Sequence, residues 1–260
     1  IHSRSEPDNI DCEADASFSN KPSSVCVIMT ADCNAQRLFK EAKAAQDVGD
    51  YKSAIKYYDM LQARYPFETY AQQAQLNTIY SYYKFGEPES AIISANHFIK
   101  LYPRHKKIDY VYYLKGLINF QLNQGSLERF LPLDRSQRDQ RAAVRAFDAF
   151  AELIKRFPNS KYNPDAKQRM IYLRNMLAQY ELHVAKFYMT RQAYVAAINR
   201  AKTIVESYQG TPTVADALAV LAKAYKVLGL NKLSNDAIQV LKLNYPNHKG
   251  IAEVQRVVVK

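Results

Sequence analysis

The sequence predicts an all-α fold, an α-solenoid of five helix pairs, and the spacing of its turns is the main reason. An aromatic residue, followed by proline in four of five cases, recurs along the 260 residues at Tyr65, Tyr102, Phe157, Tyr208 and Tyr245. The first two of these turns are 37 residues apart, and so are the last two. A fixed period of this size is typical of stacked helix pairs, in which each unit packs only on its neighbours.

The residues that precede each aromatic turn have the pattern of a packed helix. Positions eleven, seven and four residues earlier lie on one face of a helix with 3.6 residues per turn. The first of these positions is always small and the others are apolar or aromatic: Ala54, Ala91, Ala146, Ala197 and Ser234 at eleven; Tyr58, Ala95, Phe150, Ala201 and Ile238 at seven; Leu61, Phe98, Leu153, Ile204 and Leu241 at four. We therefore expect the second helix of each pair to end at its aromatic turn, where proline prevents further helix.

A second turn is expected within each pair. Gly49, Gly86 and Gly229 each stand sixteen residues before an aromatic turn, and glycine readily adopts the left-handed conformation that ends a helix. The fourth pair has Arg191-Gln192-Ala193 at this place, without glycine. Helix, glycine turn, helix and aromatic turn form the tetratricopeptide pattern, which we expect over residues 35–248.

Two segments depart from the period. Residues 126–139 lengthen the third pair, and they include the large apolar residues Phe130, Leu131 and Leu133. We expect this insertion to contact a partner, although an inert loop or one folded back on the solenoid would also fit. From Asp165 to Thr190 no glycine or proline interrupts the helical spacing of apolar residues, which predicts one helix of about 25 residues joining the third and fourth pairs.

These patterns predict how the chain is organised. Residues 1–34 are rich in Ser, Asp, Asn and Glu and are expected to form a disordered arm. The first three pairs occupy residues 35–160, the fourth and fifth pairs occupy residues 161–250, and residues 251–260 form a C-terminal tail.

Composition and motifs exclude several functions. The formal net charge of +11 suits an acidic partner or simply a solvated surface, but no run of five basic residues exists, so we expect no nucleic-acid binding. No apolar run approaches the roughly 20 residues of a membrane-spanning helix. The five histidines and three cysteines show no metal-ligand or nucleophile spacing, and no glycine-rich phosphate loop is present. We therefore expect no enzyme activity, no cofactor and no metal.

Six strings of the sequence point to a known family. They are Arg64-Tyr65-Pro66-Phe67, residues 70–76 (YAQQAQL), residues 79–84 (IYSYYK), Asp134-Arg135-Ser136 in the insertion, Arg156-Phe157-Pro158-Asn159-Ser160, and Ala196-Ala197-Ile198-Asn199-Arg200. Together they resemble the BamD family, the tetratricopeptide lipoproteins of the bacterial outer-membrane β-barrel assembly machinery. The similarity runs from about residue 35 to residue 248 and includes the insertion, which generic repeat proteins lack.

The resemblance implies a non-enzymatic scaffold on the periplasmic face of the outer membrane, held there by lipid on an N-terminal cysteine. The repeats of residues 35–160 would receive the C-terminal targeting segments of unfolded outer-membrane proteins. The repeats of residues 161–250 would dock the barrel subunit BamA, with accessory Bam lipoproteins alongside. In this family the arginine of an Asn-Arg pair in the fourth unit ion-pairs with BamA, and the pair corresponds to Asn199 and Arg200. Without the resemblance, Arg200 would be interpreted as an ordinary exposed arginine.

Two alternatives stay open. A lipobox requires a small residue before its cysteine, whereas Cys12 and Cys33 follow aspartate and Cys26 follows valine, so the lipidated residue is not assigned. The chain could also be another periplasmic or cytosolic tetratricopeptide adaptor that binds protein C-termini. The cytosolic carboxylate clamp has asparagine after the glycine of its first turn, where this chain has Asp50.

A client-binding slot is expected among aromatic and basic side chains of the first two pairs. Its predicted members are Lys52, Tyr65, Phe67, Tyr80, Tyr83 and His97. The lysine and histidine would meet the terminal carboxylate of an extended peptide, and the rings would meet its aromatic side chain. The alternative is that most of the twenty tyrosines belong to the core of the repeats.

Overall fold

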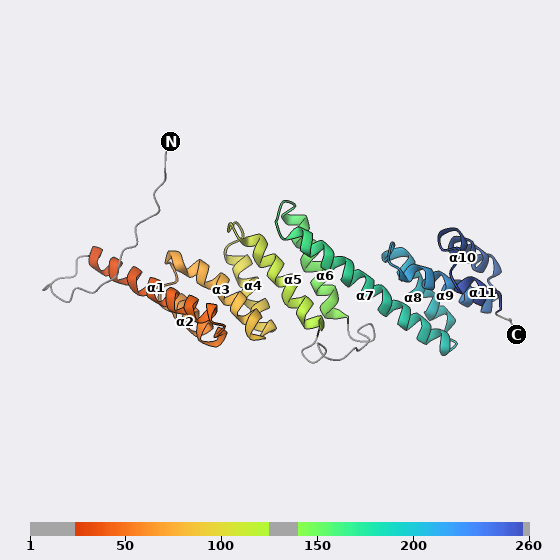
Figure 1. Ribbon diagram of the computed structural model, residues 1–260, viewed down its shortest axis with the longest axis horizontal. Helices are drawn as coiled ribbons and strands as arrows, with labels where there is room; N and C mark the ends of the chain where they lie inside the picture. Colours follow the sequence, from red (N-terminus) through yellow and green to blue (C-terminus); the bar gives the residue numbers. More distant parts are fainter. Residues whose placement is uncertain (1–23, 125–139, 257–260) are drawn as a thin grey trace, which may run out of the picture. The chain divides into compact units, whose positions relative to one another are not determined.

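Every described element of the chain is a helix or a turn, so the all-α prediction is confirmed. The structure, a computed structural model, describes residues 24–124 and 140–256 (Figure 1). Its contacts divide the chain into two compact units, an N-terminal unit of Ile1–Leu101 and a C-terminal unit of Tyr102–Lys260. The division of binding roles near residue 160 concerns partners and stays a prediction.

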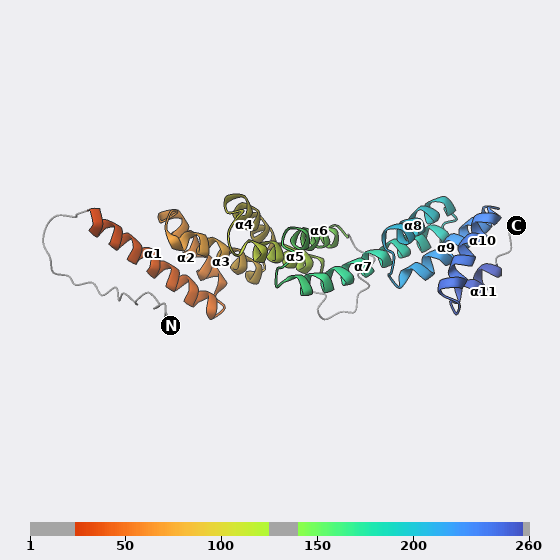
Figure 2. The same cartoon turned by 90° about the horizontal axis from the view of Figure 1, so that it is seen from above.

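The described residues contain the five expected helix pairs, and a short helix follows them. The N-terminal unit holds α1 (Ser24–Asp47), α2 (Tyr51–Arg64), α3 (Thr69–Phe85) and α4 (Pro88–Leu101). The C-terminal unit holds α5 (Ile108–Gln124), α6 (Arg141–Arg156), α7 (Asn163–Thr190), α8 (Tyr194–Ser207), α9 (Thr213–Val227), α10 (Asn231–Asn244) and α11 (Gly250–Gln255). The two helices of each pair pack on each other and run in opposite directions (Figures 1 and 2).

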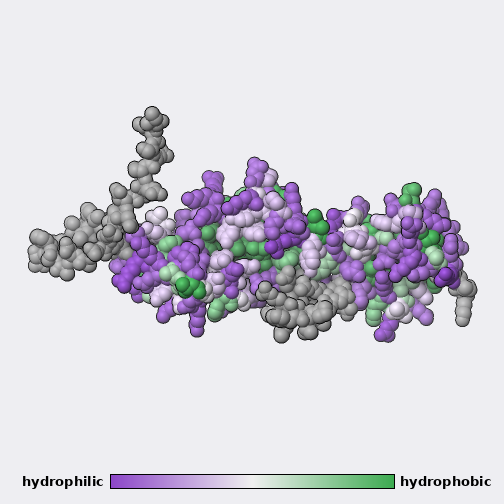
Figure 3. Space-filling view, in the orientation of Figure 1, coloured by the Kyte–Doolittle hydropathy of each residue, from purple (hydrophilic) through white to green (hydrophobic). Residues whose placement is uncertain are grey.

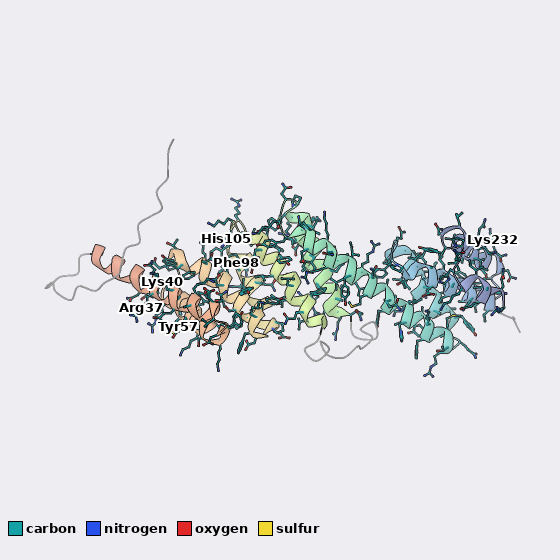
Figure 4. The ribbon with its side chains drawn as sticks, in the orientation of Figure 1. Arg37, Lys40, Tyr57, Phe98, His105 and Lys232 are labelled. Carbon is teal, nitrogen blue, oxygen red and sulfur yellow. The ribbon has the colours of Figure 1, made fainter. Side chains whose placement is uncertain are left out.

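The second helix of each pair buries the predicted face. The small residues eleven positions before the aromatic turns are buried, and so are the large residues four positions before them; Phe98 of α4, marked in Figure 4, is one of these. Ser234 stands where the other units have alanine, and its Oγ donates a hydrogen bond of 2.9 Å to the carbonyl oxygen of Ala222. A buried hydroxyl is therefore accommodated because it has a partner.

The turns within the pairs share one hydrogen-bonding scheme. Gly49, Gly86 and Gly229 all have positive φ, at 85°, 87° and 73°. In each case the N–H of the next residue donates to the carbonyl five residues earlier, as in a Schellman motif. The glycine-free fourth turn has the same bond, from Ala193 N to Tyr188 O at 3.0 Å, and Gln192 adopts φ 59° in the glycine position. Gln192 is the single non-glycine residue with positive φ in the described part of the chain.

The long helix is confirmed. Helix α7 runs for 28 residues and packs on α6, α8 and α9. It therefore links the third pair to the fourth, as its uninterrupted apolar spacing predicts.

The expected disordered arm is wrong for residues 24–34, because α1 begins at Ser24. No glycine or proline occurs between Pro22 and Gly49, so a helix nucleated in the first pair can extend toward the N-terminus at little cost. Residues 1–23 of the arm, and the insertion at 126–139, lie outside the described residues.

The first residues of the predicted C-terminal tail are helical. Helix α11 packs on α9, and its Val254 is fully buried. Among the described helices, none combines the length and the apolar character that crossing a membrane requires.

Candidate functional site

Three of the predicted client-binding residues lie at one end of the α2/α3 hairpin. Lys52 is exposed in the first turn of α2, and its neighbour Tyr51 packs against Tyr80 of α3 with ring centroids 6.4 Å apart. The ring centroids of Tyr80 and Tyr83 are 6.5 Å apart. The Lys84 ammonium lies 5.7 Å from the Tyr80 centroid and 5.9 Å from the Tyr83 centroid. We call Tyr51, Tyr80, Tyr83 and Lys84 the α3 aromatic group. Its rings are partly exposed, so they can contact a ligand as well as one another.

Tyr65 and Phe67 lie at the opposite end of α2. Tyr65 caps the helix through its backbone N–H, which donates to Leu61 O. The Phe67 side chain in the following turn is fully exposed, at 100%. Thirteen residues of helix separate Lys52 from Tyr65, which is about 20 Å at 1.5 Å per residue. These residues therefore do not converge on one pocket.

His97 lies on α4 and meets the middle of α3. Gln75 of α3 and His97 form a hydrogen bond of 2.9 Å between Nε2 and Nδ1. The Gln75 amide nitrogen can only donate, so His97 Nδ1 accepts. His97 Nε2 is then the remaining polar atom of the imidazole ring. The six predicted residues thus form a row along α3 rather than a slot, and an extended segment of about six residues would be needed to reach both ends.

The second predicted site lies on α8, where Arg200 is paired within the chain. Its Nη1 donates to both carboxylate oxygens of Glu181 on α7, at 3.2 Å and 3.1 Å. The two hydrogen bonds and the charge of Glu181 raise the pKa of Arg200. The Arg200 side chain is nevertheless 44% exposed, whereas that of Glu181 is 14% exposed. The arginine is therefore held at the surface and not enclosed in the core.

Exposed groups of several kinds lie on α8 and at the end of α7. Asn199 is exposed, and Val195, one helical turn before it, is 62% exposed. At the end of α7, Phe187 is 52% exposed, and the Arg191 guanidinium lies 5.4 Å from its ring centroid. We call these residues, with Glu181 and Arg200, the α7/α8 surface. Apolar and cationic groups side by side suit a partner that offers a carboxylate and an apolar contact.

Glu181 was not predicted from the sequence. It lies 19 residues before Arg200 and on a different helix, so no local spacing connects the two residues. The packing of α7 on α8 brings them together.

A network between α5 and α7 was also missed. Tyr113 donates to Asp165 at 2.7 Å, and Arg169 donates to the same oxygen at 2.6 Å. Burial, followed by donation to Asp165, raises the pKa of Tyr113 to about 12. The ring of Tyr162 stacks on Tyr113 with centroids 4.7 Å apart. The Asp165–Arg169 spacing is the one signal in the sequence, because residues four apart face each other on a helix. All these groups are mutually satisfied, which indicates a structural role.

The described residues contain no group of three or more His, Cys, Asp or Glu side chains arranged to hold an ion. On the face drawn in Figure 3, hydrophilic residues dominate and apolar residues form separate patches. The predicted site residues lie on two surfaces, the row along α3 and the α7/α8 surface.

Comparison with known proteins identifies the family. The family model described as "Outer membrane lipoprotein" (YfiO) matches residues 31–241. The "Outer membrane protein assembly factor BamD" of Neisseria meningitidis serogroup B is 43% identical over 84% of this chain and 82% of its own length. Those of Xylella fastidiosa strain Temecula1 and Vibrio cholerae are 39% and 36% identical, each over 82% of this chain and over 73% and 88% of their own lengths.

The solved structure of the MamA protein is similar over 87% of this chain and 98% of its own, at 18% identity and a TM-score of 0.33. The extent and identity of the curated matches decide the assignment. The chain belongs to the YfiO (BamD) family of outer membrane lipoproteins.

Proposed function

We propose that this protein is a non-enzymatic scaffold of the outer-membrane β-barrel assembly machinery, attached by lipid to the periplasmic face of the outer membrane. The repeats of residues 161–250 dock BamA through the α7/α8 surface, and accessory Bam lipoproteins bind alongside. The repeats of residues 35–160 receive the targeting segments of unfolded outer-membrane proteins. The names of the relatives support membership of this machinery.

The exposed guanidinium of Arg200 is the observation that carries the docking proposal. It sits on α8 beside Asn199, in the Asn-Arg pair by which the family is expected to contact BamA. Its pairing with Glu181 uses one nitrogen and leaves the group 44% exposed. A second carboxylate can therefore reach it without breaking the internal pair.

The row along α3 supports the client-binding part of the proposal. An extended segment that ends near the α3 aromatic group can place one aromatic side chain against Tyr80 and Tyr83 and its carboxylate near Lys52. The rest of the segment then runs past His97 toward Phe67. Two ends about 20 Å apart require an extended peptide and disfavour a compact ligand.

The test of docking is an affinity measurement between the full chain and the soluble periplasmic part of BamA. A hydrogen bond to a charged group contributes about 1.5–3 kcal/mol, so Arg200→Ala should weaken binding by more than tenfold. Lys202→Ala is the matched control, because Lys202 is an exposed cation on the same helix. Equal affinities for wild type, Arg200→Ala and Lys202→Ala would remove the α7/α8 surface from the proposed function.

The test of client binding uses a synthetic peptide with a C-terminal aromatic residue and a free carboxylate. We expect the double variant Lys52→Ala, Tyr80→Ala to bind it more weakly than wild type. The control is Lys56→Ala, an exposed cation one turn further along α2. Undiminished peptide binding by the double variant would contradict the assignment of this row.

A further inference from the structure

We propose that Glu181 is a positioning residue, which holds Arg200 in one orientation and leaves the other edge of its guanidinium open for a partner carboxylate. The inference rests on the proposed docking of BamA through Arg200. It goes beyond that function because it names the residue that presents the arginine and the geometry of the contact.

The hydrogen bonds define which edge of Arg200 is occupied. Both oxygens of Glu181 accept from the same atom, Nη1. Nε and Nη2 make no hydrogen bond to any residue that the structure describes. These two nitrogens form the edge that can donate two parallel hydrogen bonds to a carboxylate. Arg200 can therefore bridge Glu181 and an acidic side chain of the partner.

The side chains of Glu181 and Arg200 differ in how far they are buried. The Glu181 side chain is 14% exposed and that of Arg200 is 44% exposed. Glu181 lies on α7 next to Leu182, which is 1% exposed, and Arg200 lies next to the fully buried Ala201 of α8. Glu181 is thus the more enclosed member of the pair, and it is too shielded to serve as the partner contact itself.

Two opposing effects decide whether Glu181 raises or lowers the affinity for BamA. Ordering a free arginine at an interface costs about tenfold in affinity, because the side chain loses the freedom of several torsions. Glu181 removes much of this cost by ordering the arginine beforehand. Against this, a second carboxylate about 6 Å from Glu181 is repelled, but at a solvated surface with physiological salt this amounts to roughly twofold. The net effect favours binding by about fivefold.

The experiment measures the affinity of the full chain for the soluble periplasmic part of BamA by calorimetry. We expect Glu181→Ala to lose about fivefold, and Glu181→Gln to lose less, because the amide oxygen can still accept from Nη1. Arg200→Lys should lose more than tenfold, since the ammonium can reach Glu181 but has no second edge. Adding Glu181→Ala to Arg200→Lys should change affinity little further.

A matched control removes an arginine–glutamate pair elsewhere in the same unit. Arg156 and Glu152 form such a pair on α6, at 2.9 Å, and Glu152→Ala should bind BamA as wild type does. Far-UV circular dichroism checks that each variant is folded, and Glu181→Gln serves if the alanine variant is not.

The outcomes separate the inference from the proposed function. If Glu181→Ala and Glu181→Gln bind as tightly as wild type or tighter, while Arg200→Ala binds weakly, Glu181 competes for the arginine and the inference is overturned. If Arg200→Ala also binds like wild type, the proposed docking surface itself is overturned.

Discussion

The turn between α7 and α8 gives a sharp test of how the pairs are built. Gln192 adopts φ 59° where three other pairs have glycine, and a non-glycine residue in the left-handed region costs about 1–2 kcal/mol. Glycine loses more chain entropy on folding, which returns about 0.5–1 kcal/mol. Gln192 is exposed, so its side chain adds little packing. We therefore expect Gln192→Gly to raise the free energy of unfolding by about 0.5–1 kcal/mol.

The reverse substitution is the matched experiment. Gly229 has φ 73°, and no atom lies within 4 Å of the position that a Cβ would take, so Gly229→Gln adds backbone strain without a clash. It should lower the free energy of unfolding by about the same 0.5–1 kcal/mol. Urea denaturation followed by circular dichroism measures both, and thermal midpoints should move by about 1–4 °C in opposite directions.

Shifts of the same sign in the two variants would refute this account of the turns. Because Gln192 itself lies outside the α7/α8 surface, Gln192→Gly should leave BamA affinity unchanged. The variant therefore also separates turn stability from docking.

Three further predictions follow from individual contacts. Gly116→Ala should destabilise the C-terminal unit by about 1–3 kcal/mol, because the added Cβ would collide with the ring of Phe150; a denaturation midpoint equal to that of wild type would contradict the packing of α5 on α6. The pKa of Tyr113 is raised to about 12 from 10.0, so its protonated phenol stabilises the fold below pH 10 and this contribution is lost as pH rises from 10 to 12. Tyr113→Phe should accordingly lose less stability than wild type between those two pH values, and equal losses would remove the Tyr113–Asp165 hydrogen bond from the account. Phe67→Ser should leave stability within about 0.5 kcal/mol of wild type, because the ring is fully exposed, but it should weaken binding of the aromatic-ended peptide; a variant that destabilises the fold would show that Phe67 belongs to the core.

The repeat architecture could be predicted because its causes are local. Glycine at positions such as Gly49 and small residues such as Ala54 act within one hairpin, and their spacing in the sequence is their spacing in the fold. The start of α1 was misjudged because polar composition suggested disorder, whereas the absence of helix breakers before Gly49 allowed the helix to continue.

The candidate sites were harder to predict because their causes are tertiary. Arg200 could be predicted as a site residue from the resemblance of the sequence to a family. Its partner Glu181 could not, since only the packing of α7 on α8 brings the two residues together. For the client site, residue type indicated which side chains could bind a peptide. Their positions on α2, α3 and α4, with Lys52 and Tyr65 at opposite ends of α2, show that they are spread over about 20 Å and do not converge on one pocket.

The central claim is that one chain carries two separate binding surfaces, one for an unfolded client and one for BamA. The most direct measurement is the affinity of each variant for both ligands, the aromatic-ended peptide and the periplasmic part of BamA, with each ligand also tested in the presence of the other. We expect Arg200→Ala to lose affinity for BamA alone. We expect the Lys52→Ala, Tyr80→Ala variant to lose affinity for the peptide alone, and wild type to bind both ligands at the same time. Loss of both ligands in either folded variant, or exclusion of one ligand by the other, would contradict the claim.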